Sequence, residues 1–267
     1  MATPTVGTIT NNNNGDSATS GQTFDSTIDA GSDIAIVFIG LGDGLADTTH
    51  DTVTLGGDSM TKLDEHGDTN EVLGCSVWYK TSPQTGTVEV VASWQNVERA
   101  AICVLPFTGV DTGTPFGAVT KAMSTRGTAV TADAAGDTDD LMLNFLVHRD
   151  GTDTTASFAA NQTERGNAAG GTNIAAPHSY LATEPFNTTA SSPVTLAATL
   201  DNSEAWVQIV VALKNGAGGA ANANTSRSYP RGVGRGIRNG VTHAMKKVND
   251  LFVPDRRLII PVGATLS

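Results

Sequence analysis

The residue types that most often carry chemistry are thinly spread along this chain. Glu98 and Glu204 occupy equivalent places in two similar segments, and a glycosidase needs such a pair of carboxylates. A simpler role for both glutamates is to accept hydrogen bonds in turns or to keep the turns soluble. The histidines of the first 215 residues form no Ser-His-Asp or HExxH arrangement; they are His50, His66, His148 and His178. We therefore expect no catalytic residues.

Two aspartate-rich loops raise the question of calcium binding. They are GDGLADTTHD, with Asp43, Asp47 and Asp51, and ADAAGDTDD, with Asp133, Asp137, Asp139 and Asp140. Closely spaced carboxylate oxygens are the ligands that Ca²⁺ prefers. However, neither loop has the spacing of an EF-hand, and acidic turns are expected on a protein whose net charge is −11. We predict solvated turns, with no metal ion and no other cofactor.

Aromatic side chains could stack on sugar rings. The large aromatics of the first 215 residues are Trp78, Trp94, Trp206, Tyr79 and Tyr180. Aromatic residues are only 5% of the chain, so we expect most of them to be needed in the core. Trp78 and Tyr79 are neighbours in a strand-like segment and so face opposite ways, which leaves one of them as a candidate for a sugar-binding surface.

The two cysteines, Cys75 and Cys103, both lie in strand-like apolar segments. Two cysteines without metal-ligand spacing indicate neither a disulfide framework nor a zinc site. We expect buried free thiols, with a disulfide across a sheet as the alternative.

Short apolar segments separated by Gly, Asn, Asp and Pro predict an all-β protein. The strand-like segments are 33–40, 51–57, 76–81, 86–94, 99–107, 140–148, 179–184, 193–200 and 205–214. No segment before Gly216 has a long helical period, and no apolar run reaches the roughly 18–20 residues that span a bilayer. The N-terminus also lacks the features of a secretion signal. We expect an antiparallel β-sandwich that resembles a jelly roll.

The chain also contains an internal echo. Residues 33–39 resemble residues 140–146, and 87–107 align without gaps on 193–213. Each half would then end in a hairpin, with one strand, an Asn-x-Glu turn and a more apolar strand. Similar hairpins can explain this without symmetry; the alternative is a pseudo-symmetric sandwich. In both cases we expect the halves to share one core, because neither has enough apolar strands to close a sandwich alone.

The order of these motifs resembles a lectin-like β-sandwich module of tailed-phage virion proteins and some bacterial surface proteins. The resemblance rests on TVTLGGDSMTKL, SPQTGTVEVVAS and FTGVDTGTPF, and it covers roughly residues 5–215. It implies the sandwich fold and a place in the virion, as a decoration or tail-accessory protein. It implies no catalytic residues.

Charge divides the chain into an acidic body and a basic end. Residues 226–267 hold eight Arg and Lys against two Asp, a net charge of +6, which leaves −17 for the rest. Between them, NGAGGAANANTS has the composition of a flexible linker. We therefore predict a body at 1–215, a linker at 216–225 and an extended arm at 226–267. Residues 241–253 of this arm can form a short amphipathic helix, which Pro254 would end.

The arm mixes basic with apolar residues, which favours protein docking over nucleic acid. Counterion release on DNA would need only the basic side chains, whereas buried apolar side chains stabilise a protein contact by roughly 1.5–3 kcal/mol each. An arm that packs back on its own body is the remaining alternative. The predicted docking residues are Arg231, Arg235, Arg238, Met245, Val248, Phe252, Leu258, Ile259 and Ile260.

Together these patterns predict a non-enzymatic structural component of a tailed-phage virion. A capsid decoration (cement) or accessory protein, made in the host cytoplasm and anchored by its arm, fits them best. Its partners would be capsid or tail subunits and copies of itself, without nucleic acid or membrane. The alternative is a carbohydrate-binding module, from a tail fibre or surface lectin, that recognises a host-surface glycan.

Overall fold

The computed structural model describes residues 3–13, 19–42, 50–68, 73–149, 154–169, 177–183 and 193–216. Every helix or strand in this part of the chain is a β-strand, which confirms the predicted all-β class. These residues include no helix long and apolar enough to cross a membrane. They all belong to one compact unit, Met1–Ala220, which is distinct from Ala221–Ser267. The predicted arm, its helix and the linker after Gly216 lie outside the described residues.

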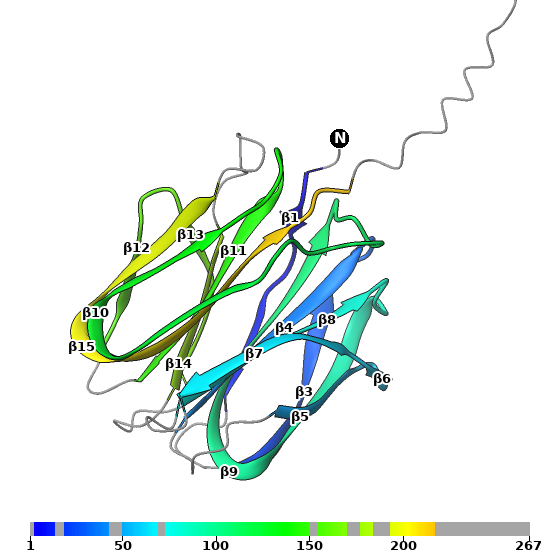
Figure 1. Cartoon of the computed structure of the whole chain (residues 1–267). Coiled ribbons are helices and arrows are strands. Elements are labelled where there is room, and N and C mark those ends of the chain that lie inside the picture. Colours follow the sequence, from blue (N-terminus) through cyan, green and yellow to red (C-terminus); the bar gives the residue numbers. More distant parts are fainter. Residues whose placement is uncertain are drawn as a thin grey trace, which may run out of the picture. The chain divides into compact units, whose positions relative to one another are not determined.

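The first half of the body forms one antiparallel sheet of nine strands (Figure 1). Its order is β6-β5-β9-β4-β8-β7, and β1, β2 and β3 also pair with β9. The strands are β1 (Thr5–Val6), β2 (Thr10–Asn13), β3 (Thr19–Ile28), β4 (Ile34–Gly42), β5 (His50–Leu55), β6 (Asp58–Ser59), β7 (Thr61–Asp68), β8 (Leu73–Thr81) and β9 (Gly86–Thr108).

The second half forms a separate antiparallel sheet of six strands. Its order is β10-β15-β11-β14-β13, and β12 also pairs with β15. The strands are β10 (Thr120–Ala134), β11 (Leu141–Arg149), β12 (Ala156–Phe158), β13 (Thr163–Ala169), β14 (Pro177–Thr183) and β15 (Val194–Leu213). Each half of the chain thus builds its own sheet.

The two sheets share one hydrophobic core, as predicted, and form a sandwich-like architecture. Strands β11, β14 and β15 lie against β4, β8 and β9. Phe38 from the first sheet and Phe145 from the second meet with their ring centroids 5.0 Å apart. The core is built by fully buried side chains of both halves, including Ile34, Ile36, Phe38, Cys103, Leu105, Phe107, Leu143, Phe145, Val147, Val207, Ile209 and Val211.

Strand β4 supplies two cores at once. Ile36 and Phe38 enter the shared core, whereas Val37 and Ile39 enter an outer core of the first half. That outer core is completed by side chains of β3, β5 and the N-terminal part of β9: Ile28, Val53, Leu55, Val88, Val90, Ala92 and Trp94. All nine residues of β4 are buried, so the strand reads as a continuous apolar run rather than as an alternating one.

Strand β11 is placed in the same way in the second half. Phe145 enters the shared core, while Leu146 and Met142 enter two smaller clusters on the opposite face. Those clusters include Val130 and Leu196, which come from β10 and β15. Each half therefore covers the outer face of its central strand with its own layer, in addition to the shared core.

The predicted hairpins at 86–107 and 193–214 are wrong, because β9 and β15 each run on as one long strand. Residues of β9 up to Glu98 pair with β3 and β5, whereas those from Arg99 onward pair with β4. Figure 1 shows both long strands curving between layers. The polar Asn-x-Glu segment therefore marks a bend and not a reversal. The strand continues in the same direction through the bend, and the pairing register shifts there.

The two halves repeat one pairing register. Ile34 pairs with Phe107 in the first half, and Leu141 pairs with Leu213 in the second. These four residues are equivalent in the aligned segments of the sequence. The similarity is therefore structural, which favours the pseudo-symmetric interpretation over a chance likeness of two hairpins.

One aspartate precedes each central strand, Asp33 before β4 and Asp140 before β11. Each accepts a hydrogen bond from a backbone N–H at an equivalent position of its half. The Asp33 carboxylate accepts hydrogen bonds from the backbone N–H of Gly109, at 2.6 Å, and of Val110, at 3.1 Å. The Asp140 carboxylate accepts one from the backbone N–H of Asn215, at 3.1 Å. Asn215 also pairs with Val110 through an isolated bridge, so the ends of both halves meet at this point.

Buried amides link β11 and β15 to Gln162, which lies between β12 and β13. Asn144 Nδ2 donates a hydrogen bond to Gln162 Oε1 at 2.8 Å, and Gln208 Nε2 donates to Asn144 Oδ1 at 2.8 Å. Gln208 Nε2 also donates to the carbonyl of Leu196, and Gln162 Nε2 to that of Ala197. An unpaired buried polar group costs about 1–3 kcal/mol, so these bonds offset most of the cost of burying the amides. Gln208 Oε1 has no hydrogen-bond partner among the described residues.

We expect Phe38→Ala and Phe145→Ala each to lower the free energy of unfolding by about 3–5 kcal/mol, because each leaves a cavity in the shared core. The rings touch, so the double variant should lose less than the sum, by about 0.5–1.5 kcal/mol. Urea unfolding followed by tryptophan fluorescence measures both. Phe158→Ala, outside the shared core, is the control and should be additive with Phe38→Ala. Two transitions, each shifted by only one variant, would contradict a shared core.

Candidate functional site

The docking residues predicted in the arm lie outside the described residues, so their role stays a prediction. They are Arg231, Arg235, Arg238, Met245, Val248, Phe252, Leu258, Ile259 and Ile260. The described body carries two polar clusters of its own. One is a pocket on the second sheet, and the other joins the edges of the two sheets.

The tryptophans are buried in the body. Trp78, Trp94 and Trp206 are each at most 6% exposed, and the first two donate indole hydrogen bonds within the fold. Tyr79 is half-buried against the shared core, and the side chain of Tyr180 lies outside the described part of the structure. The tryptophans thus serve core packing, as the low aromatic content predicted, and offer no broad face to a sugar.

Two of the candidate catalytic residues have clear surroundings. His148 is fully buried, with its Nδ1 2.9 Å from the carbonyl oxygen of Arg149. Glu204 lines the pocket described below, whereas the side chain of Glu98 lies outside the described part of the structure. The fold therefore does not bring His148 to a surface where it could meet a substrate.

The described aspartates of the second acidic loop engage in turn and cross-strand hydrogen bonds. Asp140 accepts a hydrogen bond from the backbone N–H of Asp137 at 2.8 Å, and Asp133 accepts one from the Thr195 hydroxyl at 2.7 Å. The side chains of the first loop, at 43–51, are outside the described part of the structure. Within the described ranges, no group of three or more His, Cys, Asp or Glu is arranged to hold a metal ion.

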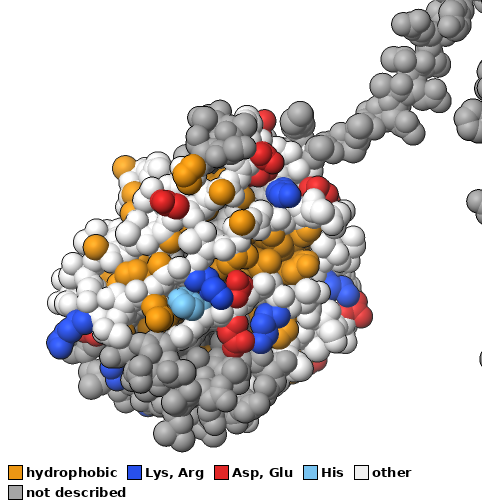
Figure 2. All heavy atoms as spheres, in the orientation of Figure 1, with side chains coloured by type: hydrophobic (Ala, Val, Ile, Leu, Met, Phe, Trp, Pro, Cys, Tyr) orange, Lys and Arg blue, Asp and Glu red, His pale blue; other side chains and the backbone are white. Residues whose placement is uncertain are grey.

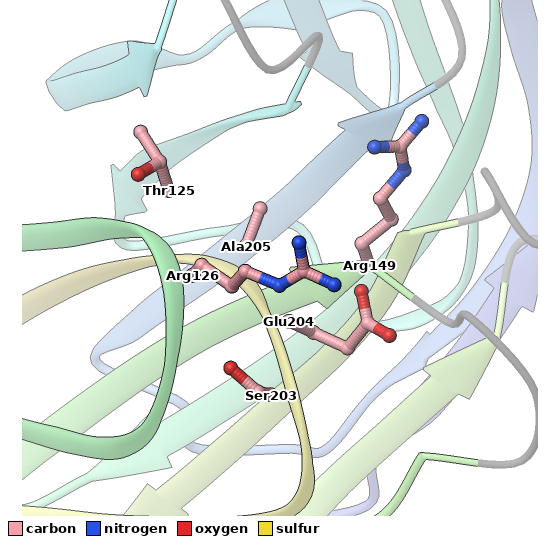
Figure 3. A pocket seen from close by; sticks show the side chains of 6 residues that line it. All are labelled: Thr125, Arg126, Arg149, Ser203, Glu204 and Ala205. Atoms are coloured by element: carbon pink, nitrogen blue, oxygen red, sulfur yellow. The ribbon is translucent and has the colours of Figure 1, made fainter.

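A polar pocket of about 300 Å³ lies where β10 and β15 bend (Figure 3). Three neighbouring strands supply its walls, since β15 pairs with both β10 and β11. The lining residues are Thr125 and Arg126 of β10, Arg149 at the end of β11, and Ser203, Glu204 and Ala205 of β15.

Irregular strand pairing produces the wall on the β10 side. Between the pairs Ser124–Trp206 and Gly127–Glu204, β10 has two residues where β15 has one. Such a β-bulge bends its strand and redirects side chains, and bulges are frequent next to functional sites. One of the two bulged residues is Arg126, so the bulge determines where this guanidinium lies.

A second irregularity lies directly beside the first. Between the pairs Gly127–Glu204 and Ala129–Thr199, β10 has one residue, whereas β15 has the four residues 200–203. Asp201, within this excursion, accepts hydrogen bonds from the backbone N–H and the hydroxyl of Thr155, at 3.0 and 2.9 Å. These bonds hold the pKa of the Asp201 carboxyl below its usual range. These hydrogen bonds thus hold residues 200–203 of β15 against Thr155.

The charges of Arg126 and Glu204 are not neutralised in pairs. Neither residue forms an ion pair with another described residue. In Figure 3 the Arg126 guanidinium points toward the Glu204 carboxylate, whereas the Arg149 side chain extends away from it. The pocket thus brings two of the few basic residues of the body, which carries a net charge of −17, to one place together with Glu204. Sequence reasoning selected Glu204 but missed both arginines, whose only signal was that basic residues are rare in the body.

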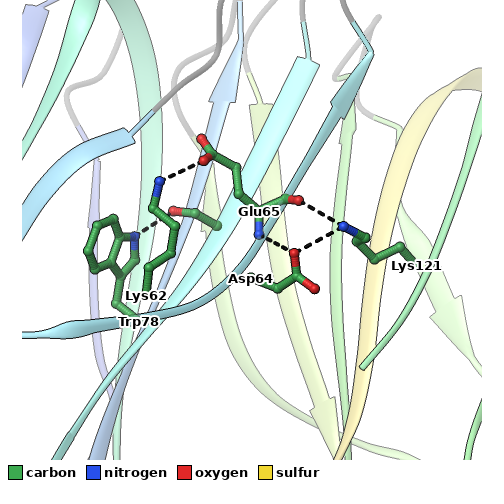
Figure 4. A network of polar contacts seen from close by, with 6 residues as sticks. Lys62, Asp64, Glu65, Trp78 and Lys121 are labelled. Atoms are coloured by element: carbon green, nitrogen blue, oxygen red, sulfur yellow. Dashed lines mark hydrogen bonds and ion pairs between the residues drawn. The ribbon is translucent and has the colours of Figure 1, made fainter. Parts of the chain in front are cut away.

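The second polar cluster bridges the edge strands of the two sheets (Figure 4). Lys121 of β10 lies 3.0 Å from the Asp64 carboxylate and donates to the carbonyl of Glu65 in β7. Lys62 pairs with the Glu65 carboxylate at 2.6 Å and lies 5.0 Å from the centre of the Trp78 ring. Exposed ion pairs contribute only about 0–1 kcal/mol each. Their charges also discourage other strands from pairing with these edges.

Apolar side chains border the shared core near this bridge. Leu63, Tyr79, Phe116 and Val119 pack against the core and are half-buried, with the rings of Tyr79 and Phe116 4.9 Å apart. Figure 2 shows hydrophobic patches on one face of the body with Lys, Arg, Asp and Glu interspersed around them. Met123 of β10 is 49% exposed.

Both cysteines are free and buried, which confirms the prediction. Burial raises the pKa of the Cys103 thiol to about 12, and raises that of Cys75 as well, with the Glu65 carboxylate adding to the effect. Both thiols therefore stay protonated through the physiological range of pH.

Comparison with known proteins gave no match: no family model, no curated protein and no solved structure is significantly similar to this chain.

We expect Cys75 and Cys103 to resist alkylation by iodoacetamide at pH 8 while the body is folded. A thiol reacts as its thiolate, and the raised pKa and the burial both suppress that form. Mass spectrometry over time, with and without 6–8 M urea, measures the labelling. Fast labelling of the native protein, at the rate of the unfolded chain, would show that the shared core opens readily.

Proposed function

We propose that this protein is a non-enzymatic structural component of a tailed-phage virion, anchored by its C-terminal arm. A capsid decoration (cement) or related accessory role fits best. The observation that carries the proposal is that the body builds its cores before Gly216, while the basic and partly apolar segment follows it. The resemblance of residues 5–215 to virion sandwich modules supports the same role.

The cores of the described residues are assembled from side chains that precede the arm. The shared core and the outer cores are filled by residues up to Leu213. In this proposal the apolar residues of the arm gain free energy by burial against a partner. A neighbouring subunit of the particle, or another copy of the body, provides such a surface.

Electrostatics favour the same arrangement. Bodies with a charge of −17 repel one another when they are crowded, and segments with a charge of +6 bridge them. We include in this proposal that the sandwich is related to a jelly roll. In this chain, however, each half forms its own sheet.

A carbohydrate-binding module is the second candidate. The observation that favours it is the polar pocket with its two arginines and one glutamate. The burial of the three tryptophans weighs against a sugar platform built on aromatic faces. A glycan would then be recognised by charge and hydrogen bonds.

Replacing Leu258, Ile259 and Ile260 together by Ser should weaken attachment to particles more than replacing Arg231 and Arg235 by Ala. The first change removes apolar area that we expect to be buried, whereas the second mainly slows the encounter. The measurement adds each purified variant to particles that lack the protein and counts bound copies by quantitative gel or mass spectrometry.

The matched control is a chain that ends at Ala220, checked for folding by circular dichroism. It should fold, and it should not bind. Full occupancy by this shortened chain would mean that the body carries the attachment, and the proposed anchor would be wrong. The docked state of the whole protein should resist moderate salt, because apolar contacts are not screened as charges are.

A further inference from the structure

We propose that the seam between β7 and β10 is a docking surface for the apolar segment 258–262 from the arm of a second copy of this chain. The seam is the side of the sandwich where these two edge strands face each other, and its apolar residues are Leu63, Tyr79, Phe116, Val119 and Met123. The inference rests on the anchoring arm proposed above, and it names the surface that one copy offers to the arm of the next.

The internal repeat provides a control for this surface within the same molecule. On the opposite side of the sandwich β13 lies against β2 and β9, and these strands are equivalent to those at the seam. Leu63 and Arg165 each lie at the bulge of their strand. Met123 and Asn13 pair with equivalent residues of β15 and β9. The fold thus accepts a basic and a polar residue at these places, so it does not itself require the apolar ones.

The two sides of the sandwich are closed by different means. Gly166 follows the bulge of β13, and a Cβ added there would lie 3.1 Å from Cys103 Sγ, so the backbone of β13 comes close to the first sheet. Asp64 has the equivalent place after the bulge of β7, and Lys121 meets it across the seam at 3.0 Å (Figure 4). Side chains rather than a close approach of backbone therefore span the seam.

The apolar residues of the seam remain partly open to solvent. Four of them pack against the shared core and are half-buried. Met123 is 49% exposed, and within the described ranges it is the one large hydrophobic side chain that is exposed. Figure 2 shows hydrophobic side chains on the face that carries β7 in Figure 1, with charged side chains between them. Apolar surface rimmed by charge is typical of an interaction site, and methionine adapts to irregular partners.

The arm supplies a segment of matching chemistry. Two arginines precede Leu258, Ile259 and Ile260, so a basic end is joined to an apolar one. The body, at −17, attracts the basic end, and the seam can bury the apolar end. The ion pairs of Figure 4 already neutralise the charges at the seam, so an apolar segment can dock beside them without leaving one of these charges unpaired.

The place where the described chain ends agrees with this occupant. Leu213 pairs with Phe116 through an isolated bridge, and the N–H of Gly216 donates to the carbonyl of Gly109 at 2.7 Å. The residues after Gly216 thus start near one end of a seam. About 40 residues separate Gly216 from Leu258, and a flexible chain of that length spans about 35 Å. This is about twice the radius of gyration of a body of this size, so a neighbouring copy is within reach.

A contact of this kind is weak by itself and repeats. A segment of about five residues buries far less than the roughly 1,200 Å² of a stable interface, so free copies should associate weakly. Each copy has one arm and one seam, so the contact is head-to-tail and can join a row of copies. Copies that are held side by side on a particle would gain from it by avidity.

Photo-crosslinking of the intact protein tests the contact. Ile259 is replaced by p-benzoylphenylalanine, and equal amounts of ¹⁴N- and ¹⁵N-labelled protein are mixed at about 1 mM, where a weak contact is populated. We expect crosslinks to the peptides that contain Leu63 or Phe116, identified by mass spectrometry. Docking on a second copy predicts as many mixed-isotope pairs as same-isotope pairs.

The matched variants give the seam the residue types of the opposite side. Leu63→Arg and Met123→Asn introduce what the fold already carries at the equivalent places, so we expect the double variant to fold. It should lower the crosslink yield to the Phe116 peptide by about tenfold or more. Thr131→Arg adds the same charge at an exposed position in the outer layer of β10 and should leave the yield unchanged. Circular dichroism reports whether each variant is folded.

Three outcomes would overturn the inference. Same-isotope pairs alone would place the segment on its own body. Crosslinks that spread over the body, or that the double variant leaves unchanged, would exclude the seam. The absence of crosslinks to the body would exclude a second copy as the partner.

Attachment to particles is measured separately, with the chain that ends at Ala220. If that chain fails to attach and the seam is not crosslinked, the anchoring arm stands and only its site on a second copy is wrong. If that chain attaches fully and the seam is crosslinked, the anchor is wrong and the seam stands.

Discussion

The structure depends on the burial of two central strands, β4 and β11, on both of their faces. Successive side chains of a strand point to opposite sides, so each of these strands must supply two cores. A single pair of packed sheets would bury only one face of each. The outer layers, formed by the N-terminal parts of β9 and β15 with β3, β5, β10 and β12, follow from this requirement. The long strands bend because one continuous strand serves both layers.

A comparison of the two halves separates the structural features that both share from those that only one half has. The registers of β4 with β9 and of β11 with β15 coincide, and the aspartates before β4 and β11 hold equivalent backbone groups. The cores differ: Val37 and Ile102 in the first half correspond in the alignment to Asn144 and Gln208 in the second. An apolar pair can be replaced by hydrogen-bonded amides only when both amides are present, because one alone would be unsatisfied.

Sequence reasoning located the buried strands and missed most of the polar ones. Segments such as 33–40 and 140–148 were visible because they are apolar on both faces, and they became β4 and β11. Strands such as β3, β7 and β10 were not predicted, because they are rich in polar residues and Gly, which also occur in turns. The Asn-x-Glu segments predicted hairpin turns, because local composition does not distinguish a turn from a strand bend that is supported by long-range pairing.

The pocket could not be predicted from the sequence for a related reason. Arg126 and Glu204 are far apart in the chain, and they line one pocket beside a bulge and a four-residue excursion that lie next to each other on β10 and β15. Register irregularities depend on both strands at once and leave no periodic signal in either. The irregular pairing also brings charged side chains into one cavity, where they interact with one another more strongly than with the distant acidic surface. With a Debye length of about 8–10 Å, the distant acidic surface is largely screened, whereas charges that line one cavity are not. The charge of the whole body governs how copies approach one another, and the charges within the pocket govern what binds in it.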